Sequence, residues 1–115
     1  MSFETQAFCQ TGPTIKFTAG LAASLGEQAK AVGSTPASQY RVFNVSAGTI
    51  FVASGQTAIE ARDNAVIPTG SGGGAKNSMP LATLTSMIVS APSDCFWSGI
   101  AASAGDFYVT PGRGL

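Results

Sequence analysis

Short apolar runs at nearly regular intervals limit what this chain can fold into. From residue 39 onward, runs rich in Val, Ile, Phe and Tyr alternate with short segments that contain Gly, Pro, Ser or Asp. Strand candidates spaced about ten residues apart, with turn residues between them, are typical of a β-sandwich or a small barrel. The sequence therefore predicts an all-β fold, an antiparallel β-sandwich or a jelly-roll-like barrel.

The expected elements can be placed along the chain from the period of their apolar residues. Ala47-Gly48 between two runs predicts a hairpin turn that pairs them. The pattern then changes, because Thr57 is suited to an N-cap and Glu60 follows at the capping-box spacing, so we expect one short helix over residues 57–64. The segment 20–36, rich in small residues, is expected to be a loop. The expected strands are residues 14–19, 39–46, 49–54, 65–67, 84–90, 95–101 and 106–110.

The first thirteen residues differ from the rest of the chain because they show no sustained period. They end at the turn signal Gly12-Pro13. We interpret residues 1–13 as an extended N-terminal arm and residues 14–115 as a single β-sandwich domain, a size that can bury its own core. Phe3 and Phe8 lie on a segment too short to have a core, so we expect them to contact another protein.

Several expected strands carry bulky apolar residues at consecutive positions, which point to opposite faces of a sheet. Cover by a loop or helix of the same chain is one explanation, but few segments are available for it. An exposed apolar patch larger than a few hundred Å² drives association. We therefore expect a permanent oligomer or a place in a larger shell. The candidate interface residues on the sheets are Phe51, Met87, Phe96 and Trp97, of which Trp97 also suits a core position.

Charge is low, at 10% of residues with a net charge of zero, against about 25% in an ordinary soluble domain. The basic residues are scattered singly, so we expect no nucleic-acid binding. Zero net charge favours association. No apolar stretch approaches the ~20 residues of a membrane span, and the N-terminus lacks the pattern of a signal peptide. We therefore expect a soluble chain with no membrane partner, made in the cytoplasm.

The residues that most often carry chemistry are scarce. The chain has no histidine, which is the commonest general base, and two cysteines alone do not make a zinc site. The Gly-rich segment 70–77 departs from a phosphate-binding loop, with Ala75 in place of the last Gly and Asn77 in place of the Ser or Thr. We expect no enzyme activity, catalytic residue, metal or cofactor, and we expect Cys9 and Cys95 to be free thiols.

A group of segments carries a resemblance to a known class of protein. The chain resembles the small β-sandwich virion proteins of tailed bacteriophages, among them capsid decoration (cement) proteins. The segments are Gln39–Gly48, Phe51-Val52 with Ala58, Asn64–Pro68, Phe96–Ile100 and Tyr108–Leu115.

The resemblance implies a structural virion protein on the outer capsid surface. Its partners would be the major capsid protein and further copies of itself, as a dimer or trimer. Two alternatives stay open. One is a tail or fibre module that binds a host surface ligand through Tyr40, Trp97 and Tyr108, and the other is a head-to-tail connector subunit.

Overall fold

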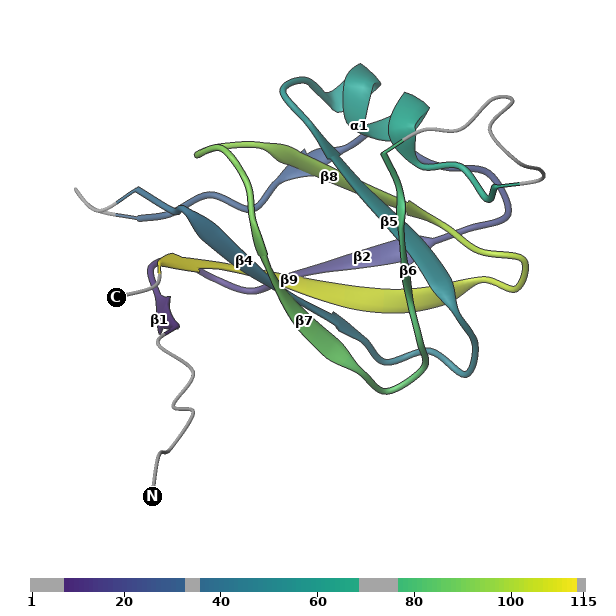
Figure 1. The fold of residues 1–115 in the computed structure, drawn as a ribbon. Helices are drawn as coiled ribbons and strands as arrows, with labels where there is room; N and C mark the ends of the chain where they lie inside the picture. The colour runs from purple at the N-terminus through teal and green to yellow at the C-terminus, as the bar shows by residue number, and fades with distance from the viewer. Residues whose placement is uncertain (1–7, 33–35, 69–76, 114–115) are drawn as a thin grey trace.

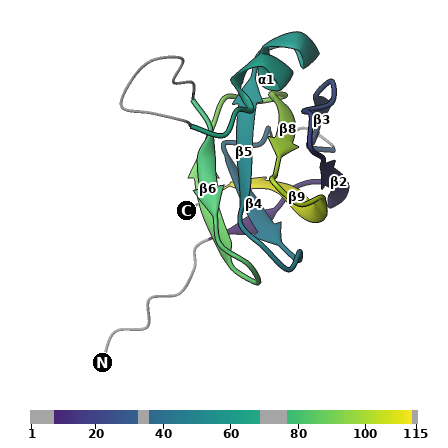
Figure 2. The same ribbon diagram turned by 90° about the vertical axis from the view of Figure 1, so that its right-hand side faces the viewer.

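Two antiparallel sheets pack face to face in the computed structural model, which describes residues 8–32, 36–68 and 77–113 (Figure 1). Figure 2 shows the sheets as two layers with the helix α1 at one end. This confirms the expected all-β sandwich with one short helix. The strands are β1 (Cys9–Gln10), β2 (Ile15–Ala19), β3 (Glu27–Gln28), β4 (Gln39–Asn44), β5 (Ile50–Gly55), β6 (Met79–Leu81), β7 (Ser86–Ser90), β8 (Phe96–Ile100) and β9 (Gly105–Arg113), and the helix is α1 (Ala58–Asn64).

The strand order is that of a jelly roll. The first sheet has the order β2-β9-β4-β7, with β1 pairing the far end of β9 on the same side as β2, and the second has the order β3-β8-β5-β6. β9 thus returns to lie between β2 and β4, and β8 returns between β3 and β5. Two such returning connections over eight strands define the double Greek key of a jelly roll.

The expected hairpin at Ala47-Gly48 is wrong, because β4 and β5 lie in different sheets. The chain crosses between the layers over residues 45–49, and the fully buried Asn44 holds this corner. Its Nδ2 donates to the carbonyl oxygens of Gly48 and Leu81, both at 2.9 Å, and its Oδ1 accepts from the Ser46 backbone N–H at 2.8 Å. A turn sequence marks a reversal of the chain but does not say which strands pair.

The core lies between the sheets and contains the largest aromatic side chains. Phe17 stacks on Phe107 with ring centroids 5.1 Å apart, and Tyr40 packs against Trp97 at 5.3 Å. Gly99 makes room for Phe107, since a Cβ there would lie 2.5 Å from Phe107 Cε1. The alternating buried positions of β4 and β9 line this core, which accounts for the period of two in their sequences.

The helix α1 forms as expected and covers one end of the second sheet. Thr57 is its N-cap, with Thr57 Oγ1 accepting from the Glu60 N–H at 3.1 Å, and Glu60 Oε1 accepts from the Gln56 N–H at 2.8 Å. Gly55 permits close packing, because a Cβ there would lie 2.6 Å from the Ala61 nitrogen. In the described part of the chain, no helix has the length and apolar character needed to cross a membrane.

Other boundaries differ from those expected. Residues 65–67 are not a strand, and β3 and β6 form in segments where none was expected. β7 begins at Ser86 instead of residue 84 because Leu84 has a left-handed backbone, with φ of 55°. Residues 9–10 of the expected arm form β1 and pair with β9, so this part of the arm belongs to the first sheet.

Candidate interaction surface

The side of the first sheet that faces away from the core carries a group of large side chains. Tyr40, Val42 and Asn44 of β4 are fully buried, so Arg41 and Phe43 between them point outward. The strand register places Ile88 of β7 beside Arg41 and Tyr108 of β9 beside Phe43. Phe8 lies on the same side, as shown below. We call these five side chains the outer face: Phe8, Arg41, Phe43, Ile88 and Tyr108.

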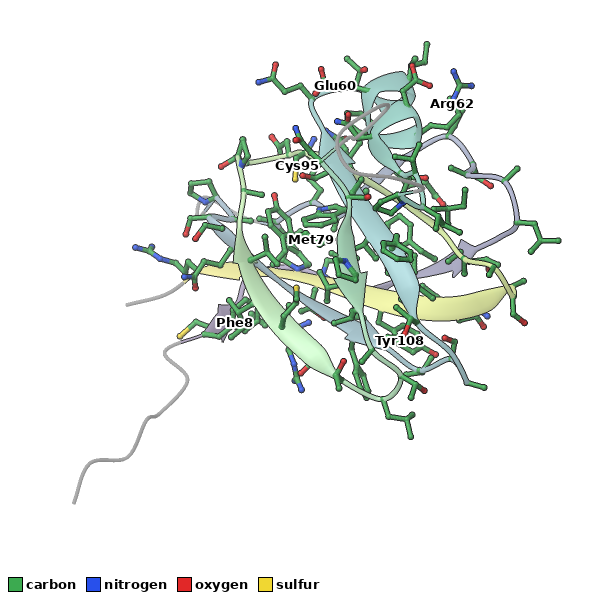
Figure 3. The ribbon with its side chains drawn as sticks, turned by 45° about the vertical axis from the view of Figure 1, so that its right-hand side comes forward. Phe8, Glu60, Arg62, Met79, Cys95 and Tyr108 are labelled. Carbon is green, nitrogen blue, oxygen red and sulfur yellow. The ribbon has the colours of Figure 1, made fainter. Side chains whose placement is uncertain are left out.

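The Phe8 ring fits on the outer face because Gly112 of β9 has no side chain. Gly112 of β9 pairs with Gln10 on one side and Gln39 on the other, and a Cβ on Gly112 would collide with the Phe8 ring. The ring therefore rests on the backbone of β9. Figure 3 shows Phe8 at β1 and Tyr108 along β9, whereas Glu60 and Arg62 project from α1 at the other end of the molecule.

An open groove of about 630 Å³ crosses the outer face. It is lined by Phe8, Arg41, Ser86, Met87 and Ile88. This volume falls in the range of about 300 to 1,000 Å³ that is common for binding clefts. Because its lining includes Phe8 and residues of β7, the groove extends from the start of β1 to β7. The Arg41 guanidinium lies in its wall.

Arg41 is exposed and carries its charge without a carboxylate partner among the described residues, where the recorded ion pair joins Arg62 to Asp63. Its Cζ lies 6.0 Å from the centroid of the Phe43 ring, and Nη2 donates weakly to Ser86 Oγ at 3.5 Å. A guanidinium next to an aromatic ring gains about 0.5–1 kcal/mol at exposed sites. Within residues 8–32, 36–68 and 77–113, the other N–H groups of this guanidinium have no hydrogen-bond partner, so they can bind a carboxylate or backbone carbonyls of another protein.

The structure distributes the predicted interface residues over both sheets. Phe8 lies on the outer face, while Phe3 falls outside the described residues. Met87 is half-buried and packs against the core cluster. Phe51 and Phe96 are half-buried on the outward side of the second sheet, so they do not join Phe8 in one surface.

Trp97 is a core residue with no exposed surface, which corrects its assignment as an interface residue. The same holds for Tyr40, which is fully buried and donates from its hydroxyl to the Pro92 carbonyl oxygen at 3.0 Å. Of the three aromatic side chains expected to line a ligand groove, Tyr108 alone reaches the surface. A module that binds a host ligand through this trio therefore does not fit the fold.

Sequence reasoning missed Arg41, Phe43 and Ile88 as members of the surface. The sequence does indicate the first two, because Arg41 and Phe43 are two residues apart in the expected strand and therefore lie on the same face. They alternate there with the apolar residues Tyr40 and Val42. Once Tyr40 and Val42 are assigned to the core, the opposite parity faces outward. No local signal places Ile88 beside Arg41, since that depends on the pairing of β4 with β7.

The two cysteines are free, with Cys9 exposed and Cys95 buried. Burial raises the pKa of the Cys95 thiol, so at neutral pH this thiol stays protonated and poorly nucleophilic. A pocket of about 170 Å³ between the end of β5 and α1 includes Cys95 and Glu60. It is smaller than an ordinary ligand cleft, and Glu60 is engaged there in capping α1. Of the Gly-rich segment 70–77, Asn77 alone is described.

Comparison with known proteins gives few matches. No family model matches the sequence, and no curated protein matches it. Among solved structures, a protein of the Bacillus endospore appendages, which form a novel family of disulfide-linked pili, is similar over 100% of this chain and 95% of its own. The two sequences are 16% identical and the TM-score is 0.44, values that assign neither a family nor a function to this chain.

Proposed function

We propose that this protein is a non-enzymatic structural subunit that attaches to a larger protein assembly through its outer face. The observation that carries the proposal is the position of Arg41, exposed and without a carboxylate partner in the described structure, among Phe8, Phe43, Ile88 and Tyr108. Arginine and aromatic residues supply most of the strongest contacts in protein interfaces.

The chemistry of the outer face indicates the kind of surface that it would bind. A complementary partner would present a carboxylate or a row of backbone carbonyls to Arg41 and apolar side chains to the groove between Phe8 and Ile88. Each half-buried apolar side chain that becomes fully covered contributes about 1 kcal/mol, a fraction of the 1.5–3 kcal/mol for complete burial. A single copy would bind weakly, and many copies on a symmetric surface would together stabilise the assembled state.

The finer proposal is that the assembly is the capsid of a tailed bacteriophage and that this protein decorates its outer surface. Its support is the resemblance of residues 39–115 to capsid decoration proteins. The partner would then be the major capsid protein, and the mature location would be the outside of the virion.

Binding to capsids tests the proposal. Purified protein is mixed with capsids that lack it, the capsids are sedimented, and the bound copies are counted. We expect hundreds of copies per particle and a higher melting temperature of the decorated capsid. Capsids that bind no protein, or that melt identically with and without it, would contradict the decoration role.

Substitutions on the outer face test the attachment surface itself. Arg41→Ala should weaken binding at least about tenfold, the effect of 1.4 kcal/mol, and Phe8→Ala about fivefold, the effect of about 1 kcal/mol. Arg62→Ala on α1 is the matched control, since it removes an arginine at the other end of the molecule. Binding that is equally weakened by Arg62→Ala, or unchanged by Arg41→Ala, would show that the outer face is not the attachment surface.

A further inference from the structure

The four edges of the two sheets differ in how well they are protected against pairing with another strand. Natural sheets protect their edges with short strands, proline or lysine. β3 has two residues and β6 has three, including Pro80. The edge formed by β1 and β2 is interrupted at Gly12-Pro13 and carries the exposed Lys16.

β7 has none of these protections. It is five residues long, Ser86–Ser90, and contains no charged residue, proline or glycine. Within the described part of the chain it pairs with β4 alone, which leaves its other backbone edge without a strand partner. Met87, Ile88 and Val89 are all half-buried, although Met87 and Val89 pack against the core and Ile88 faces outward.

The sequence of β7 is nearly symmetric about Ile88. If two copies of Ser-Met-Ile-Val-Ser align antiparallel with Ile88 opposite Ile88, then Ser86 faces Ser90 and Met87 faces Val89. Every apolar residue meets an apolar residue and every polar residue meets a polar one. No charges are brought together, and apolar cross-strand pairs contribute about 0.2–1 kcal/mol each.

We propose that β7 pairs with β7 of a second copy of this chain, antiparallel across a two-fold axis through Ile88. The pairing joins the two first sheets into one continuous sheet, satisfies the backbone groups along the free edge and covers the exposed parts of Met87 and Val89. A two-fold interface requires a self-complementary surface, which the symmetric sequence of β7 supplies. The proposal does not depend on the proposed attachment to a larger assembly.

The pairing places the two outer faces next to each other. The groove beside Arg41 reaches Ser86, Met87 and Ile88, so it would continue toward the groove of the second copy. A dimer of this kind would present two Arg41 side chains on one side of the joined sheet.

A charge-swap experiment at residue 88 tests the pairing. Because residue 88 faces itself, Ile88→Glu and Ile88→Lys should each raise the dimer dissociation constant at least about tenfold, measured by sedimentation equilibrium. An equimolar mixture of the two variants should form heterodimers again. Ile100→Glu is the matched control, since Ile100 is a half-buried isoleucine on β8, which has strands on both sides, and its dimer should persist.

Cysteine cross-linking tests the register without added charge. In a Cys9→Ser background, Ile88→Cys should give a covalent dimer on mild oxidation, because directly opposite residues lie about 4.5–5.5 Å apart between Cα atoms. Ser86→Cys should not, because Ser86 pairs with Ser90 and the two copies of residue 86 lie four residues apart along the strands, about 13 Å.

Several results would overturn the proposal. They are a wild-type chain that stays monomeric at millimolar concentration, a Glu and Lys mixture that forms no heterodimer, and cross-linking at residue 86 as efficient as at residue 88. Dimerisation that is lost when residues 1–7 are deleted would also overturn it, because the N-terminal segment, and not β7, would then make the contact.

Discussion

Replacing Asn44 by alanine should remove the hydrogen bonds that hold the corner between the two sheets. The side chain is fully buried, donates to the Gly48 and Leu81 carbonyls, and accepts from the Ser46 N–H and hydroxyl. A net contribution of about 1 kcal/mol for each of these four bonds gives a loss of about 4 kcal/mol in the free energy of unfolding. A domain of this size has about 5–15 kcal/mol in total.

Urea unfolding followed by tryptophan fluorescence measures this loss, since the single tryptophan, Trp97, lies in the core. With a slope of about 1.5 kcal/mol per molar urea, the midpoint should fall by about 2.7 M while the slope stays constant. Ser46→Ala is the control, because it leaves the backbone bond to Asn44 and removes the Ser46 hydroxyl, whose one proton is shared between Asn44 Oδ1 at 2.6 Å and the Gly48 carbonyl oxygen at 2.8 Å and which accepts weakly from the Gly48 N–H at 3.4 Å. It should cost about 1–2 kcal/mol. If Asn44→Ala costs no more than Ser46→Ala, the corner does not depend on the Asn44 side chain.

Three further predictions concern the helix, one loop and the titratable core. Gly55→Ala should destabilise the fold by about 1–3 kcal/mol, because the added Cβ would lie 2.6 Å from the Ala61 nitrogen. Gly48→Ala is the control, since the space around Gly48 is open and the urea midpoint should change little. Leu84→Asn should raise the melting temperature slightly, because Leu84 is 70% exposed with φ of 55° and asparagine tolerates this left-handed backbone better than leucine. A lower melting temperature would mean that the leucine side chain makes a stabilising contact. Burial raises the pKa of the Tyr40 hydroxyl and of the Cys95 thiol. The unfolded chain therefore loses these protons at a lower pH than the folded chain does. The free energy of unfolding should then fall as pH rises above about 9. Tyr40→Phe should show a smaller fall in the urea midpoint between about pH 8 and pH 10.5, and an unchanged fall would show that Tyr40 does not contribute to it.

The sequence by itself determined the features that depend only on residues a few positions apart in the chain. The alternation in residues 15–19 and 106–110 corresponds to β2 and part of β9, and Thr57 with Glu60 begins α1 where the capping pattern indicated. These features follow from backbone geometry and hydrogen bonds within a few residues, so a local pattern is enough to find them. The all-β class follows in turn from the number and spacing of such runs.

The tertiary structure alone decided which strands pair and which side of each strand is covered. A period of two is the same whether β4 pairs with β5 or with β7 and β9, so the sequence predicted a hairpin where the chain crosses between sheets. Trp97 faces the core because the first sheet packs on that side of β8, where Tyr40 of β4 meets it. Phe8 rests on Gly112, a residue at the opposite end of the chain. Contacts between residues so distant in sequence depend on the packing of the whole domain, which no local pattern records.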